Sequence, residues 1–410
     1  MSPYAINMDT GGLDVARAAV RLAPDDPQSH WSIAEIEKRS LAPEELAASI
    51  REYEEAASRS PNDYRLWMDL GRARAQAGDA AGGEQALRRA VELAPSYAWP
   101  RWYLGNALVR RGKLDEGITE LRFAASRNQE LRSPVFDLAW HIYGEDVRII
   151  NEKLADSTEA RAQLTTYLLG HKRIEDALKL WDTLNPAEKR NEHATGEALM
   201  NTLLQAKQYH AAIKLYATFA RQGVEIPQVG QLQNNGFESD NGIVTNGSVT
   251  GADAFGWHVK SVPQAQVAID ARNHHDGNRS LRVVFNAPTN VSFTNIAQFV
   301  AIDPATHYRL QFSIRTKDLR SAGTPILQVV SATDNSTLGS SAPLSTGTSE
   351  WQQVTIDFAT DAKTEGVTLL INRAPCNAGD TVCPIFGTVW YDDFNLQRLG
   401  AGSGNNAARR

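Results

Sequence analysis

The spacing of hydrophobic residues changes once along the chain, near residue 225. Before this point apolar residues recur every three or four positions, which predicts amphipathic helices. Glycines and prolines interrupt the pattern at intervals, as expected of helices joined by short turns. The sequence therefore predicts a helical region over residues 1–225.

This helical region repeats itself with a period of 34 residues. Leu70 and Gly71 recur as Leu104 and Gly105 at the next repeat. A period of this length is typical of solenoids, in which each helical hairpin buries its apolar face against its neighbours.

Seven positions of one repeat follow the pattern of a known family: Trp67, Leu70, Gly71, Gly83, Leu87, Ala90 and Pro95. Their order resembles that of tetratricopeptide repeats. Small residues allow the two helices of a hairpin to approach closely, and Pro95 ends a helix. The resemblance covers residues 1–129, and we expect residues 130–225 to continue the solenoid as divergent helical hairpins.

The first repeat is incomplete. Residues 17–24 match the second helix of the repeat that ends at residue 95. The first helix of the repeat that contains residues 17–24 would therefore precede Met1. Either the amino terminus is an unusual cap, or sequence is missing before Met1. Because solenoids need polar caps to stay soluble, this end could accept another subunit.

The family resemblance also implies a protein-binding groove. Tetratricopeptide solenoids usually bind partners on the concave side, and tryptophans beside arginines suit an extended peptide. The alternative is that Trp99 and Trp102 pack against the next hairpin. The expected groove residues are Arg65, Met68, Arg72, Trp99, Trp102 and Asn106.

After residue 225, short runs with alternating polar and apolar residues replace the helical pattern. Turn-rich clusters separate these runs, which together predict an antiparallel β-sandwich or jelly roll. The overall fold class is thus a multidomain α + β protein. The expected parts are a linker at 226–231, the sandwich at 232–398 and a flexible tail at 399–410.

Six short motifs occur in order along this second region. They are NGFE at 235–238, FGW at 255–257, DGNRSL at 276–281, YRLQF at 308–312, WQQV at 351–354 and WYDDF at 390–394. This succession resembles the jelly-roll carbohydrate-binding modules of families 4 and 9.

The resemblance implies a structural calcium ion that ties the first strand to the last. Glu238 and Asp393 match its ligand positions, with the loop near Asn278 adding oxygens. Oxygen ligands from distant segments suit a hard cation. The alternative is that Asp392 and Asp393 cap the final strand.

The resemblance further implies a sugar-binding sheet face, on which amides and arginines bind hydroxyl groups. Residues 308–314 alternate, so that one side of this strand is core and the other is polar. No clear pair of outward aromatic residues accompanies it. The glycan-binding candidates are Gln298, Arg309, Gln311, Arg315, Gln328 and Asn372.

Both cysteines of the chain lie in one turn-rich segment. Cys376 and Cys383 have no nearby second pair of metal ligands, which favours a local disulfide over a zinc site. Two unpaired thiols are the alternative. A disulfide would indicate a location outside the cytoplasm, in the periplasm, at the cell surface or secreted.

Composition excludes several function classes. The net charge of -6 gives no support to nucleic-acid binding or to direct insertion into a membrane, and no long apolar run is present. No phosphate loop, dinucleotide fingerprint or nucleophile elbow is found, so we expect no enzymatic activity.

The sequence therefore predicts a non-catalytic, extracytoplasmic scaffold. Its solenoid would bind a protein partner, and its sandwich would bind or dock on a surface polysaccharide, with structural calcium as the one expected cofactor. The alternative is a structural subunit that assembles into a surface filament through head-to-tail solenoid contacts.

Overall fold

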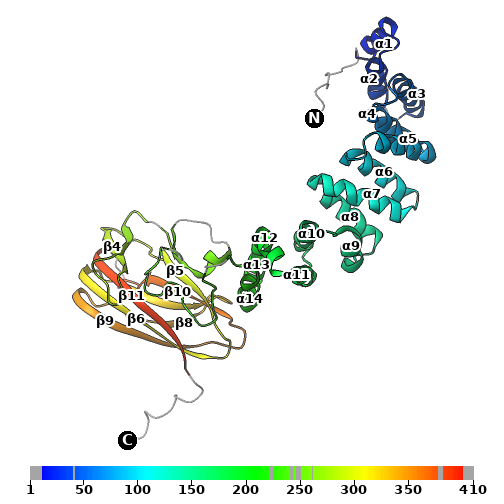
Figure 1. The fold of residues 1–410 in the computed structure, drawn as a ribbon. Helices are drawn as coiled ribbons and strands as arrows, with labels where there is room; N and C mark the ends of the chain where they lie inside the picture. Colours follow the sequence, from blue (N-terminus) through cyan, green and yellow to red (C-terminus); the bar gives the residue numbers. More distant parts are fainter. Residues whose placement is uncertain are drawn as a thin grey trace. The chain divides into compact units, whose positions relative to one another are not determined.

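The computed structural model describes residues 12–39, 42–221, 225–240, 243–245, 251–260, 262–376 and 382–399. The chain divides into two compact units, Met1–His171 and Lys172–Arg410. The first unit is helical, and the second combines helices with two β-sheets (Figure 1). The predicted fold class, an α-solenoid followed by an antiparallel β-sandwich, is confirmed. Residues 400–410 of the predicted tail lie outside the described residues.

The first unit is built from consecutive helical pairs. Its helices are α1 (Gly12–Leu22), α2 (Pro27–Glu37), α3 (Pro43–Arg59), α4 (Tyr64–Gln76), α5 (Ala80–Leu93), α6 (Ala98–Arg110), α7 (Leu114–Arg127), α8 (Arg132–Ile142), α9 (Val147–Leu154) and α10 (Thr158–Gly170). Helix α1 packs on α2, and the hairpins α2–α3, α4–α5 and α6–α7 follow. The first helices of successive hairpins, α4 and α6, are also in contact.

Glycines at the crossing points bring the two helices of a hairpin close together. A Cβ atom on Gly71 would lie 2.6 Å from Leu87 Cγ and 3.0 Å from the carbonyl oxygen of Gly83. In the next hairpin a Cβ atom on Gly105 would lie 2.7 Å from Leu121 Cγ. The repeat at 34 residues therefore reproduces one packing arrangement, in which only glycine fits.

Glu84 of α5 joins two successive hairpins. Its side chain is 6% exposed, and it accepts hydrogen bonds from Arg88 Nη2 at 2.8 Å and Lys113 Nζ at 2.8 Å. Arg111 forms a third ion pair with it. Burial opposes the ionisation of Glu84, but these cations keep its pKa below the usual value. Arg111 and Lys113 lie between α6 and α7, so the acid ties one hairpin to the next.

The second unit begins with α11 (Ile174–Asp182), α12 (Pro186–Asn191), α13 (His193–Gln205) and α14 (Tyr209–Phe219). Two sheets follow. The six-stranded sheet has the order β1-β2-β5-β10-β7-β8, and the five-stranded sheet has the order β3-β4-β11-β6-β9. Strands β1 and β2 are parallel, and the other pairs are antiparallel. The strands are β1 (Ile243–Thr245), β2 (Trp257–Val259), β3 (Ala265–Asp270), β4 (Ser280–Ala287), β5 (Ile296–Ala301), β6 (His307–Arg320), β7 (Pro325–Ser331), β8 (Thr337–Ser340), β9 (Gly347–Ala359), β10 (Gly366–Arg373) and β11 (Ile385–Leu399).

The core of the second unit lies between these sheets. Alternate residues of β6 are buried, as the sequence pattern predicts for residues 308–314. Phe312 stacks on Phe394 with ring centroids 5.1 Å apart, and Trp257 is fully buried. Trp351 lies half-buried on β9 beside His275.

Helix α14 packs on the six-stranded sheet. The ring of Tyr209 lies 4.5 Å from that of Phe299 in β5. A Cβ atom on Gly366, in the adjacent strand β10, would lie 2.5 Å from the Phe299 ring and 3.0 Å from the Tyr209 ring. The absence of a side chain at residue 366 therefore makes room for this contact.

Polar contacts fix the same helix to the sheet. Lys207 Nζ donates to the carbonyl oxygen of Thr333, and His210 Nε2 lies 3.0 Å from the carbonyl oxygen of Ile302. The predicted linker at 226–231 also runs along the sheet, since the N–H of Gly230 donates to the carbonyl of Ala301 at 2.7 Å.

Candidate functional site

The expected groove residues lie on α4 and α6, but they differ in exposure. Trp99 is 45% exposed, and the side chain of Arg72 is 41% exposed. Arg65 is also exposed and pairs with Asp63. These exposed side chains are available to a ligand.

The other three expected groove residues are half-buried. Met68 packs against a buried cluster that contains Leu87 and Leu104, so it supports the contact between hairpins. Trp102 and Asn106 are half-buried, and Asn106 Nδ2 donates to the carbonyl oxygen of Trp102 at 2.8 Å.

A chain of contacts crosses the first helices of three successive hairpins. The Arg72 guanidinium lies 4.5 Å from the ring centroid of Tyr103, whose ring is 6.1 Å from that of Trp99. Arg72 Nη1 donates to Asp69 Oδ1 at 3.1 Å, and Trp31 Nε1 donates to Asp69 Oδ2 at 2.9 Å. We call Trp31, Asp69, Arg72, Trp99 and Tyr103 the repeat surface.

The carboxylates of this region already accept hydrogen bonds from neighbouring side chains. Burial raises the pKa of Asp69, and the nearby Glu35 raises it further. The hydrogen bond from Trp31 opposes this rise. Glu35 itself binds Lys38 and the Tyr53 hydroxyl. The Trp99 ring and the Arg72 guanidinium are therefore the exposed groups of the repeat surface.

Sequence reasoning missed Asp69, Tyr103 and Trp31. Glu35, Asp69 and Tyr103 are spaced by 34 residues, so they occupy one position of the repeat. Because three different residue types stand there, no identity recurs to mark the position. The spacing alone could have identified it.

Similar chemistry continues on α8 and α10 of the first unit. The Tyr167 hydroxyl donates to Asp137 Oδ1 at 2.9 Å, and the Tyr167 ring lies 4.2 Å from His171 and 5.8 Å from Trp140. Burial and the bond to Asp137 raise the pKa of Tyr167. Aromatic rings paired with a carboxylate thus recur beyond the strict repeats.

The structure divides the glycan-binding candidates between the two sheets. The expectation of one shared face was wrong, because β5, β7 and β10 belong to the six-stranded sheet and β6 to the five-stranded sheet. Arg309, Gln311 and Arg315 lie on β6, Gln298 on β5, Gln328 on β7 and Asn372 on β10.

Gln298 faces the core. It is fully buried, and its Nε2 donates to the carbonyl oxygens of Gln233 at 2.7 Å and Phe255 at 3.1 Å. Its cross-strand neighbours Trp257 and Leu369 are also fully buried. The prediction that Gln298 binds sugar was therefore wrong, because no glycan reaches this position.

Gln328 and Asn372 form an amide pair on the outer side of the six-stranded sheet. Asn372 Nδ2 donates to Gln328 Oε1 at 3.0 Å, and both side chains are half-buried. Ile326 lies opposite Asn372, and Leu370 lies opposite Gln328. Amide groups and apolar surface therefore lie side by side here.

The candidates on β6 have partners on β9 or in the connection between β3 and β4. Arg309 forms two hydrogen bonds of 2.7 Å with Asp357, which lower the pKa of that carboxyl. Gln311 Nε2 lies 3.2 Å from Gln353 Oε1. Arg315 Nη1 donates to Asn273 Oδ1 at 3.1 Å.

The expected calcium ligands gather at one turn, residues 275–279. Glu238 Oε1 accepts from the N–H groups of Asn278 at 2.9 Å and Arg279 at 3.0 Å, and Asp393 pairs with His275 Nδ1. Nitrogen groups thus contact one oxygen of each carboxylate that was expected to bind calcium. Within the described ranges, no group of three or more His, Cys, Asp or Glu side chains is placed to hold a metal ion. Calcium binding stays a prediction.

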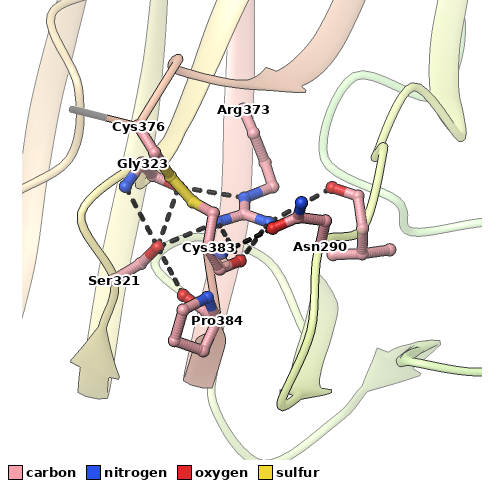
Figure 2. Close-up of a disulfide and its surroundings, with 8 residues drawn as sticks. Asn290, Ser321, Gly323, Arg373, Cys376, Cys383 and Pro384 are labelled. Carbon is pink, nitrogen blue, oxygen red and sulfur yellow. Dashed lines mark hydrogen bonds between the residues drawn. A yellow bond between two sulfur atoms is a disulfide. The ribbon is translucent and has the colours of Figure 1, made fainter. Parts of the chain in front are cut away.

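The predicted disulfide between Cys376 and Cys383 is present, with Cα atoms 6.2 Å apart. Figure 2 shows it beside Arg373, Ser321 and Asn290. Cys383 Sγ accepts a hydrogen bond from Arg373 Nη2 at 3.0 Å. Both cysteines are half-buried, so solvent reaches this end of the sandwich.

Residues 41–98 match the tetratricopeptide repeat family. A search of curated proteins gave no match. Among the helices that the structure describes, none is both long and apolar enough to cross a membrane.

Several solved structures are similar to parts of this chain. The TPR protein YrrB, with an unusual peptide-binding site, shares 12% identity over 50% of this chain and 91% of its own, with a TM-score of 0.27. A CBM4 structure shares 12% identity over 41% of this chain and 100% of its own, with a TM-score of 0.28. The CBM22-1–GH10 modules of Clostridium thermocellum xylanase 10B, complexed with xylohexaose, share 15% identity over 36% of this chain, with a TM-score of 0.25. The match spans 27% of that xylanase chain.

Proposed function

We propose that the protein is a non-catalytic adaptor located outside the cytoplasm. Its repeats bind an extended peptide of a partner protein, and its sandwich binds or docks on a glycan, in the assembly of a surface polysaccharide. The contact between Arg72 and Tyr103 on the repeat surface carries this proposal, because it holds an exposed cation in place against a half-buried aromatic ring.

The repeat surface suits a peptide for three physical reasons. Trp99 offers an exposed aromatic face for a ligand side chain. The Arg72 guanidinium is held by Tyr103 and Asp69, so little side-chain entropy is lost when it donates to a peptide carbonyl. Arginine and tryptophan also dominate the binding energy of many protein interfaces.

Selection from a random peptide library displayed on phage, with the full chain as bait, tests this proposal. Arg72→Ala or Trp99→Ala should weaken a selected peptide by about tenfold, or ~1.4 kcal/mol. Arg89→Ala is the matched control, because Arg89 is 42% exposed and pairs with Glu92 at 3.0 Å, as Arg72 pairs with Asp69. Equal effects of the Arg72 and Arg89 variants would rule out the repeat surface.

The amide pair on the six-stranded sheet favours glycan binding there. Gln328 and Asn372 can exchange their mutual hydrogen bond for sugar hydroxyls, and Leu370 and Ile326 provide an apolar surface for the sugar ring. A glycan array probed with the full chain identifies the ligand. Asn372→Ala should then weaken binding several-fold, whereas Gln353→Ala on the five-stranded sheet should leave it unchanged.

The disulfide supports a location outside the cytoplasm, because such bonds persist in oxidising compartments. Cell fractionation with an antibody against the protein tests this location. Recovery of the protein only in the cytoplasm would contradict it.

A second candidate function is self-association into a filament. Val15 and Leu22 on α1 are 71% and 88% exposed, and their spacing of seven residues places them on one side of the helix. Light scattering on the full chain should show an assembly that Leu22→Glu disrupts. A monomer at micromolar concentration would exclude this function.

A further inference from the structure

Three connections between the two sheets meet at one end of the sandwich. Residues 288–295 lead from β4 to β5, residues 321–324 lead from β6 to β7, and the segment with both cysteines leads from β10 to β11. Each connection passes from one sheet to the other. The side chain of Arg373 lies among them (Figure 2).

Arg373 donates hydrogen bonds to all three connections. Its Nε donates to Gly323 O at 3.0 Å, its Nη1 to Val291 O at 3.2 Å and its Nη2 to Ser321 Oγ at 2.9 Å. Both Nη atoms also donate to Cys383 O at 3.3 Å. All of these acceptors are neutral, and in the described part of the chain no charged partner shifts the pKa of Arg373, which burial alone lowers. Its positive charge is therefore half-buried and uncompensated.

The sulfur of Cys383 is the group that can compensate this charge. It lies 3.0 Å from Arg373 Nη2. In the disulfide this sulfur is neutral and accepts only weakly. After reduction, a thiolate at the same place would form a charge-assisted hydrogen bond with the guanidinium. A neighbour that stabilises the reduced form makes a disulfide easier to reduce.

We propose that Cys376–Cys383 is a redox-active disulfide that exchanges with an external dithiol, and that Arg373 holds Cys383 as a thiolate in the reduced form. A thiolate of the dithiol attacks Cys376 Sγ, the bond between the two cysteine sulfurs breaks, and Cys383 leaves as a thiolate beside Arg373. The second thiolate of the dithiol then attacks the dithiol sulfur of the mixed disulfide. Cys376 leaves and takes a proton. The dithiol becomes a disulfide, and two electrons have passed to the cysteine pair.

Other hydrogen bonds keep the Cys383 segment in place after reduction. The N–H of Cys383 donates to Asn290 Oδ1, and Ser321 Oγ donates to the carbonyl oxygen of Pro384 at 2.8 Å. The disulfide closes a loop with a sequence separation of only seven residues, for which the chain-entropy contribution is about 2 kcal/mol. Reduction should therefore leave the sandwich folded and be reversible. This proposal does not depend on peptide or glycan binding.

The reduction equilibrium of the full chain tests the role of Arg373. The chain is equilibrated with mixtures of reduced and oxidised dithiothreitol, and free thiols are trapped with a maleimide-linked polymer. Arg373→Gln should lower the equilibrium constant for reduction at least tenfold, a change of ~30 mV. Arg373→Lys should have an equilibrium constant for reduction close to that of the wild type, because lysine keeps the positive charge. Arg320→Gln, at an exposed arginine that ends β6, is the control and should have no effect.

The acidity of Cys383 gives a second, independent measurement. In the Cys376→Ser variant, the alkylation rate of Cys383 against pH should show a midpoint at least one unit below the ordinary thiol value of about 8.5. A midpoint at or above that value would overturn the proposal, even if Arg373→Gln did not fold. An Arg373→Gln chain that folds and reduces like the wild type would also overturn it.

Discussion

The ring of Tyr209 in α14 lies 4.5 Å from the ring of Phe299 in β5, and the two planes are tilted by 44°. Tyr209 is 8% exposed, so this contact is largely removed from solvent. A helix of the repeat-like region and a strand of the sandwich therefore share one packed surface within the second unit. A chain cut between the last helix and the first strand would expose Phe299.

A double-mutant cycle measures this contact. Tyr209→Ala and Phe299→Ala should each destabilise the second unit by about 1–3 kcal/mol, because each removes a packed ring. Their coupling should be about 0.5–1.5 kcal/mol, as for other aromatic pairs. Urea unfolding of the full chain, followed by near-ultraviolet circular dichroism, gives these values.

The control is the pair Tyr64 and Tyr97 of the first unit, whose rings lie 5.3 Å apart. Tyr97→Ala should leave the transition of the second unit unchanged, because Tyr97 is 57% exposed and belongs to the other unit. Additive effects of the Tyr209 and Phe299 substitutions would show that the two rings do not interact.

Gly71→Ala should destabilise the first unit by about 1–3 kcal/mol, because the added methyl group overlaps Leu87 and the Gly83 carbonyl. Gly170→Ala is the matched control. Nothing lies within 4 Å of a Cβ atom there, and alanine favours the helix by up to about 1 kcal/mol. Circular dichroism at 222 nm during urea unfolding compares the two, and equal stability of both variants would contradict the close-packing argument.

Asp270 makes the sandwich sensitive to acid. Burial alone would raise its pKa, but hydrogen bonds from Trp390 Nε1, Arg272 N–H and Asn273 lower the pKa from 3.8 to about 2. The folded state therefore holds this carboxylate ionised, and its contribution is complete above pH 4 and lost as the pH falls to 2. A shift of this size corresponds to about 2 kcal/mol for a side chain that is 6% exposed.

Asp270→Asn tests this dependence. The variant should lose about 1–3 kcal/mol at pH 7 and show a weaker decline of unfolding free energy between pH 4 and 2. Asp318→Asn, at an exposed residue of β6, should keep the wild-type profile. If the unfolding free energy of the Asp270 variant fell as steeply between pH 4 and 2 as that of the wild type, other carboxyl groups would cause the acid sensitivity.

Calcium should raise the melting temperature of the full chain, and a chelator should reverse the rise. Stabilisation by a bound ion grows with its concentration relative to Kd, to about 2.7 kcal/mol at a hundredfold excess. Glu238→Gln should abolish the effect, because the variant lacks a charged oxygen ligand. Differential scanning calorimetry with and without millimolar calcium measures this effect. Identical melting temperatures would show that the protein binds no stabilising calcium ion.

The sequence predicted the architecture well, because the spacing of apolar residues reflects which positions are buried. The 34-residue spacing of Gly71 and Gly105 reflects a close helix approach that no other residue permits. Alternation in residues 308–314 likewise identified the inward side of β6. These features depend on local sequence and on one neighbour at a time.

The sites were harder to predict, because they depend on which strands are neighbours. Gln298 was placed on the wrong side because the sequence did not delimit β5, and a shift of one residue reverses every side chain of a strand. Assignment of β6 and β7 to different sheets follows from the long-range pairing order, which no local pattern contains. Arg373 was missed for the same reason, since its partners come from three connections far apart in sequence.

Glu84 has a consequence for how the repeats unfold. In a one-dimensional array, each hairpin is stabilised by its own packing and by its contact with the next hairpin. The ion pairs of Glu84 with Arg111 and Lys113 contribute to the contact between successive hairpins. Removing this single acid would leave three cations close together and weaken the link between two hairpins. The unfolding of the repeats on its two sides would then be less tightly coupled.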